Sequence, residues 1–245
     1  MTELRNARYL SVHDLRRRIN EGDVDTVLVA FNDLQGRLQG ERVHATYFAE
    51  HVLDQGLAAP AYLIAVDLDM NIADRDGQFG EQADREMRLV LDLQTIRLLR
   101  HQPGAVLVQC DLVGPDRKPV GQSPRAILRH QLKIAEGRGY HVLASTELEF
   151  MIFHNSYEDA RNAHYRDLAA ASPDHAEYSI VAGSRIEPLL RTIRNTVYAA
   201  GIDIRTIKAR RHPGQHSISL GYQDALATAD DHAVFKTIAK EIAAL

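Results

Sequence analysis

Two glutamates lie two residues apart in an otherwise apolar stretch, residues 145–153, which reads STELEFMIF. Side chains two apart on a strand project from the same face, so Glu147 and Glu149 stand together while Leu148 and Phe150 pack behind them. Two carboxylates this close raise each other's pKa unless a cation neutralises them. Oxygen ligands of this kind suit hard cations such as Mg²⁺ or Mn²⁺. The pair is a candidate divalent-metal site, and an edge strand with two solvated glutamates is the alternative.

A helix with clear end signals precedes this strand. Ser123 is its predicted N-cap, Pro124 takes the first helical position, and Gly137 and Gly139 end it. Its apolar residues recur at helical spacing and predict one buried face. The other predicted elements are helices at 12–20 and 47–57, a β-hairpin at 25–43 turning at 33–36, strands at 61–70, 89–93 and 105–113, a helix at 187–200, strands at 202–210 and 216–222, and a helix at 231–244. The polar stretch 71–87 is a predicted surface loop.

The composition is that of a soluble globular protein. The chain has 245 residues, enough for one large domain or two modest ones, with 45% hydrophobic and 25% charged residues. A net charge of -4 gives no polybasic surface for nucleic acid, and no apolar run approaches the ~20 residues of a membrane span. The N-terminal stretch is charged and predicts no signal peptide. The single cysteine, Cys110, excludes an internal disulfide and predicts a buried small hydrophobe in a cytoplasmic protein.

Motifs along nearly the whole chain resemble the glutamine synthetase family in the correct order. SPRAILRHQLKIAEGRGYHVLASTELEFMIF resembles the family's S-P-R helix followed by its E-x-E-F metal strand. The hairpin and helix over 29–56 resemble its N-terminal β-grasp domain, and HPGQHSI resembles its P-G-Q-x-E turn. DALATADDHAVFKTIAKEIA resembles the helix after that turn. The likeness is greatest to the branch that joins glutamate to polyamines or other amines.

The resemblance implies a fold, a reaction and a set of cofactors. The expected fold is α+β, with a β-grasp-like domain at 1–112 and a partial catalytic domain at 113–245 whose curved antiparallel sheet is incomplete. The expected reaction is ATP-dependent ligation of ammonia or an amine to the γ-carboxylate of glutamate through γ-glutamyl phosphate. It uses ATP and two Mg²⁺ or Mn²⁺ ions, which bridge and neutralise the phosphates. Glu147 and Glu149 match two of the family's metal ligands.

The sequence departs from the family at other ligand positions. Gly214 and Gln215 match the turn, but Arg210 and Ser217 stand where the family has glutamates. An arginine stays protonated and cannot bind a metal. The resemblance also implies that the histidine ligand, a further glutamate, the ATP contacts and the phosphate-binding arginines lie beyond residue 245, in a chain about twice as long. Asp76 lacks the serines of the family's ammonium-binding loop, so we assign it no such role.

Three hypotheses remain open at the level of sequence. The first is a degenerate member without ligase activity, a partner, regulator or relic, in which Arg210 pairs with Glu147 or Glu149. The second is an active ligase subunit, acting on glutamate and an amine, that another chain completes. The third is a fragment of a longer protein.

Two further expectations concern the replacement of ligands and the assembly of the chain. His212 and His216 are poor replacement ligands, because the turn between them breaks helical geometry and His216 faces away from position 217. An unfinished sheet leaves an exposed edge, which predicts a homo- or hetero-oligomer with no nucleic-acid or membrane partner.

Overall fold

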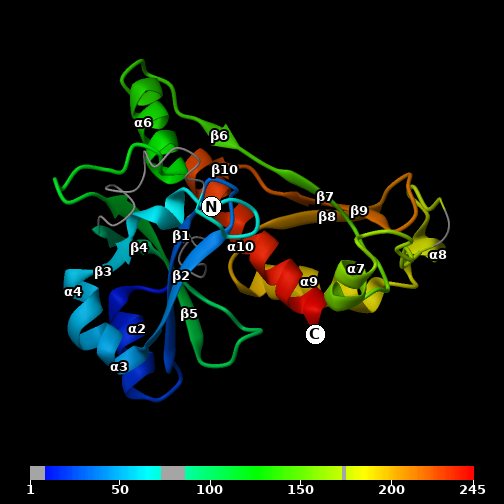
Figure 1. Cartoon of the computed structure of the whole chain (residues 1–245), viewed down its shortest axis with the longest axis horizontal. Coiled ribbons are helices and arrows are strands. Elements are labelled where there is room, and N and C mark those ends of the chain that lie inside the picture. Colours follow the sequence, from blue (N-terminus) through cyan, green and yellow to red (C-terminus); the bar gives the residue numbers. More distant parts are fainter. Residues whose placement is uncertain (1–8, 73–85, 173–174) are drawn as a thin grey trace.

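The computed structural model describes residues 9–72, 86–172 and 175–245 (Figure 1). Its N-terminal part is a five-stranded sheet with the strand order β2-β1-β5-β4-β3. The strands are β1 (Thr26–Asn32), β2 (Leu38–His44), β3 (Leu57–Pro60), β4 (Glu86–Leu98) and β5 (Ala105–Val113). The central pair β1 and β5 is parallel, and the other pairs are antiparallel. The predicted hairpin is therefore confirmed, with its turn at Asp33–Gly36.

One face of this sheet is covered by short helical segments that lie near the start of the chain. These are α2 (Val12–Asn20), α3 (Ala45–Tyr47), the π-helix η1 (Phe48–Val52) and α4 (Leu53–Gln55). Val27, Val29 and Phe31 alternate toward this face and are almost fully buried against Leu15 and Phe48. The strand period of two thus builds the first core.

The opposite face of the same sheet packs against two long helices, α9 (Glu187–Ala199) and α10 (Ala225–Ala244). Ala30 and Leu107 from the sheet share a core with Val197 of α9 and with Val234 and Ile238 of α10. Helix α10 also contacts α6 (Pro124–Glu136), which Figure 1 shows at the periphery of the molecule. The second core therefore joins the N-terminal sheet to the rest of the chain.

A second antiparallel sheet carries the paired glutamates. Its order is β7-β9-β8, with β7 (Glu147–Met151) and β8 (Ile204–Ala209) flanking β9 (Gln215–Leu220). A two-stranded ladder of β6 (Leu143–Ala144) and β10 (Gln223–Asp224) lies next to it in the chain. Two short helices, α7 (Tyr157–Asn162) and α8 (Ile180–Gly183), fill the connection from β7 to α9. The α+β prediction is confirmed.

Two sequence-based expectations about secondary structure were wrong. Residues 61–70 are not a strand, because a 3₁₀ helix η2 (Ala61–Ile64) is followed by a turn in which Asp67 accepts the backbone N–H groups of Asp69 and Asn71. Helix α10 begins at Ala225 rather than at Asp231. The predicted loop at 71–87, including Asp76, lies mostly outside the described residues. No helix in the described part of the chain is long and apolar enough to cross a membrane.

A buried group of ion pairs ties α6 and α10 to the N-terminal sheet. Arg125 of α6 is 4% exposed and binds Asp230 of α10 with two hydrogen bonds of 3.0 Å. The same guanidinium donates to Asp111 of β5 and Asp92 of β4, each at 2.6 Å. Because planar guanidinium groups bind carboxylates in this bidentate way, Arg125 fixes the positions of three elements at once.

A second buried arginine repeats this arrangement one residue further along α10. Arg97 of β4 is fully buried and donates to Asp231 at 2.9 Å. The other oxygen of Asp231 accepts from Gln223 of β10 at 2.6 Å. Since β10 pairs with β6, these bonds connect the N-terminal sheet to the chain segment that leads into β7.

Candidate metal site

The register of the second sheet places the paired glutamates on one exposed face. Glu149 lies opposite Ser217 of β9, and Ser217 lies opposite Lys208 of β8. Glu147, two residues earlier, projects to the same side, while Leu148 and Phe150 turn toward the core shared with α10. The predicted face of the strand is correct, and it carries two cations as well as two carboxylates.

Both carboxylates are ion-paired with basic side chains from β8 and the residue after it. Arg210 Nη2 lies 2.8 Å from Glu149 Oε1, and Lys208 Nζ lies 3.5 Å from Glu147 Oε1. Gln215 Nε2 donates to the second oxygen of Glu149 at 2.9 Å. The expected pairing of Arg210 with a glutamate is present, and it involves Glu149. Sequence reasoning missed Lys208, although its separation of two residues from Arg210 on one strand was a usable signal.

These contacts hold Glu147 in its charged form. The pKa of the Glu147 carboxyl is lowered, first by the Ser217 hydroxyl beside it and further by the charges of Lys208 and Arg210, although desolvation opposes the shift more strongly than either charge supports it. The serine contact does not reach full hydrogen-bond geometry. A carboxyl with a lowered pKa contributes stability that is present above its unfolded-state pKa and is lost as the pH falls through its folded-state value.

NMR titration of the Glu147 carboxyl carbon tests whether these neighbouring side chains lower its pKa. We expect Ser217→Ala and Lys208→Met each to raise the pKa of Glu147, because both side chains lower it in the native chain. Thr206→Ala, on the same face of β8, is the control and should leave the titration unchanged. An unchanged midpoint in both test variants would contradict the assignment.

The donor set does not fit a divalent cation. Lysine and arginine have hydrogen-bond donors but no lone pair to offer in their charged forms, and Ser217 supplies a neutral hydroxyl where a carboxylate would bind more strongly. Within the described residues, no group of three or more His, Cys, Asp or Glu side chains lies close enough together to hold a metal ion. Glu147 and Glu149 stay as proposed family ligands whose charges the protein itself neutralises.

The turn before β9 keeps its histidines away from this face. Gly214 has a φ of 70°, and a Cβ there would lie 2.6 Å from the backbone oxygen of Ile152, so the position requires glycine. His216 is buried on the core side, with Nδ1 3.1 Å from the Gly214 oxygen and its ring stacked on Phe150. Burial lowers the pKa of His216. His212 is exposed on the turn.

Cys110 is a residue of β5, buried in the core of the N-terminal sheet and away from the paired glutamates. It is 1% exposed, and burial raises the pKa of its thiol to about 12. A thiol with so high a pKa is not a nucleophile at neutral pH. The expectation of a buried small hydrophobe is confirmed.

Comparison with known proteins decides the family. Residues 121–245, just over half of the chain, match the glutamine synthetase catalytic domain family. The chain belongs to the glutamine synthetase family. It is 44% identical over 238 residues to the gamma-glutamylethanolamide synthetase of Streptomyces coelicolor. The matched region covers 96% of this chain and 51% of that protein. It is 28% identical over 245 residues to a glutamate–isopropylamine ligase of a Pseudomonas species, covering 53% of that protein.

Solved structures agree with this membership at the level of the fold. A complex of GmaS with ADP is 24% identical and superposes with a TM-score of 0.74 over 94% of this chain and 49% of that chain. The second sheet with its helices is part of the glutamine synthetase catalytic domain, and the reading of the five-stranded sheet as a β-grasp-like domain stays a prediction. The boundary at 112/113 stays a prediction. The chain spans about half the length of the curated relatives it matches.

Proposed function

We propose that this chain is a glutamine synthetase-like protein that performs no ligation by itself, because its own basic side chains occupy the metal strand. The observation that carries the proposal is the 2.8 Å ion pair of Arg210 with Glu149. It is supported by the 3.5 Å pair of Lys208 with Glu147 and by the serine at position 217.

The chemistry of the family explains why these replacements matter. Formation of γ-glutamyl phosphate needs divalent cations that bridge the phosphates of ATP and neutralise the charge that develops during transfer. A fixed guanidinium compensates the carboxylate charge but leaves no coordination position for a phosphate oxygen. Glu149 is therefore committed to an internal contact in place of a metal.

A role as a partner subunit fits the surface of the chain. Strand β7 is at the edge of its sheet within the described residues, and Ile127 and Ile134 of α6 are 48% and 40% exposed. Unpaired strand edges and exposed apolar side chains are typical of surfaces that another chain covers. We propose that the protein associates through one or both of these surfaces with a second copy or with a longer family member.

The test is a phosphate-release assay with ATP, glutamate, Mg²⁺ or Mn²⁺, and a panel of amines that includes ethanolamine and isopropylamine. We expect the same background rate for the protein and for its Glu147→Ala variant, because neither assembles a metal site. Turnover that Glu147→Ala abolishes would overturn the proposal. Light scattering measures the oligomeric state of the protein alone and mixed with a full-length relative, and a monomer in both samples would contradict the partner role.

A second candidate function is an active glutamate–amine ligase subunit that another chain completes. The 44% identity to a gamma-glutamylethanolamide synthetase over 96% of this chain favours it. The discriminating experiment adds a full-length relative whose own E-x-E-F glutamates are changed to alanine. Activity that appears in the mixture and disappears with Glu149→Ala in this chain would support the second candidate over the first.

A further inference from the structure

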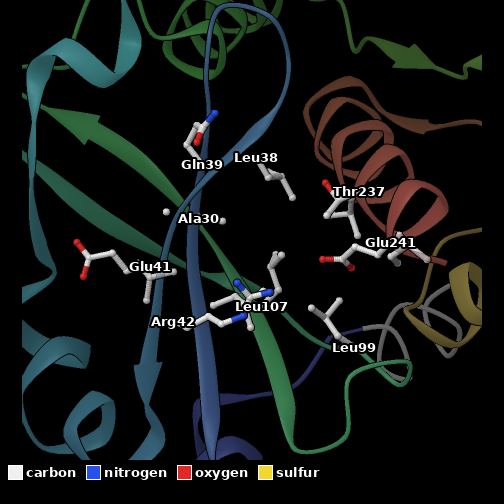
Figure 2. A pocket seen from close by; sticks show the side chains of 14 residues that line it. Ala30, Leu38, Gln39, Glu41, Arg42, Leu99, Leu107, Thr237 and Glu241 are labelled. Atoms are coloured by element: carbon white, nitrogen blue, oxygen red, sulfur yellow. The ribbon is translucent and has the colours of Figure 1, made fainter. Parts of the chain in front are cut away.

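A hollow of about 150 Å³ lies between the N-terminal sheet and α10 (Figure 2). Its floor is aliphatic and comes from strands β1, β2 and β5 and from Leu99. One wall is a single face of α10, where Val234, Thr237, Ile238 and Glu241 recur at helical spacing. An apolar cavity of roughly this size accepts a molecule of about six carbon atoms, such as benzene.

Two opposite charges border this apolar floor. Strand alternation puts Arg42 on the same face of β2 as Leu38, toward α10, whereas Glu41 is on the other face with Val43. Figure 2 shows the Arg42 guanidinium and the Glu241 carboxylate extending toward the hollow from opposite sides, and the Glu41 carboxylate pointing away. A guanidinium and a carboxylate thus face each other across aliphatic side chains.

The Arg42 guanidinium and the Glu241 carboxylate can each bind a further charged partner. The Glu241 Oε2 atom lies 2.7 Å from His101 Nε2 and accepts from Gln102 Nε2 at 2.9 Å, and these contacts fix the carboxylate at the wall. Among the described residues, no hydrogen bond engages its Oε1, and no ion pair engages the Arg42 guanidinium. Arg42 is exposed and Glu241 half-exposed, so the hollow is open to solvent at this end.

We propose that this hollow binds a short aliphatic ω-amino acid. Its carboxylate would pair with Arg42, its ammonium with Glu241, and its methylene chain would cover the floor of Leu28, Ala30 and Leu107. A molecule with charges at its two ends matches charges on two opposite walls, whereas an amine or a carboxylic acid alone leaves one wall group unpaired. The site is separate from the metal strand, and it does not depend on the absence of ligase activity.

The test is isothermal titration calorimetry with 5-aminopentanoate, pentylamine, pentanoate and norvaline. We expect 5-aminopentanoate to bind at least about tenfold more tightly than the other three, since each lost charged hydrogen bond costs about this factor or more. Equal affinity for pentylamine or pentanoate would overturn the proposal, as would no binding at all. Equal affinity for norvaline, whose charges share one carbon, would contradict the two-wall arrangement.

Single substitutions test whether Arg42 and Glu241 bind the two charged ends of the ligand. Arg42→Gln and Glu241→Gln should each weaken 5-aminopentanoate binding about tenfold, and Glu41→Gln is the matched control because its side chain points away. Circular dichroism checks that each variant is folded. If Glu241→Gln alters folding through its contacts with His101 and Gln102, the comparison of Arg42→Gln with Glu41→Gln still decides, because both residues are exposed on β2. Equal affinity of these two variants would refute the site.

Discussion

The double variant Arg210→Glu, Ser217→Glu is expected to bind Mn²⁺ at least about tenfold more tightly than the native chain. In the native protein, two glutamates face Lys208 and Arg210, and the four charges balance to zero. The substitutions convert one cation into an anion and add a second anion beside Glu149, so the formal charge of the cluster becomes minus three. Four clustered carboxylates against the one remaining cation supply the oxygen ligands that hard divalent cations prefer, and tenfold corresponds to about 1.4 kcal/mol.

Electron paramagnetic resonance of free Mn²⁺ measures this binding directly, without any requirement for catalysis. Arg211→Glu makes the same charge change as Arg210→Glu one residue later, on an exposed part of the turn, and combined with Ser217→Glu it serves as the control. We expect it to bind Mn²⁺ no better than the native chain. If the double variant and the control take up equal amounts of Mn²⁺, Arg210 is not what excludes the metal.

Arg125→Ala is expected to lower the free energy of unfolding by about 3–5 kcal/mol, the usual cost of removing one partner from a buried ion pair. The guanidinium neutralises Asp230, which is 2% exposed, and also Asp92 and Asp111. Without it, a buried carboxylate on α10 loses its counter-ion. A loss of this size is a large part of the 5–15 kcal/mol that stabilises an ordinary domain.

Urea unfolding monitored by circular dichroism measures the effect, and Arg129→Ala is the control. Arg129 lies one turn later on α6 and contacts Asp92 and Asp111 too, but its side chain is 42% exposed, so about 1 kcal/mol or less should be lost. Equal losses in the two variants would contradict the importance of burial.

The effect of pH separates electrostatics from packing in this variant. Burial already raises the pKa of Asp230, and loss of Arg125 raises it further. A raised folded-state pKa costs stability as the pH rises through it, so the difference between Arg125→Ala and the native protein should shrink from pH 8 to pH 5. A difference that stays constant with pH would point to lost packing instead.

The sequence predicted local structure well where end signals and periodicity agree. Ser123 and Pro124 set the start of α6 as expected, with the serine oxygen accepting from the backbone of Ala126. The alternation of apolar residues placed Glu147 and Glu149 on one face. These features depend on neighbours in the chain, and a single sequence contains that information.

Features that depend on distant residues were not predictable in the same way. The helix was predicted to begin at Asp231 rather than at Ala225, and Asp230 and Asp231 are buried because they pair with Arg125 and Arg97, which lie more than one hundred residues earlier in the chain. Similarly, the apolar composition of 61–70 favoured a strand, and the side chain of Asp67 formed a turn instead. Partners far apart in sequence therefore decided the burial of Asp230 and Asp231, whereas in 61–70 a local turn of Asp67 with Asp69 and Asn71 overrode the apolar composition.

The two ion pairs of the second sheet have a consequence for how its strands align during folding. Strands β7 and β8 are not neighbours, since β9 lies between them, so each pair reaches across the central strand. A slip of β8 by one residue would move Lys208 and Arg210 to the core face and bury two unpaired cations under α9 and α10. The charges that exclude a metal from this face therefore also penalise slips of β8 by an odd number of residues, and the substitutions that restore metal binding would remove part of that safeguard.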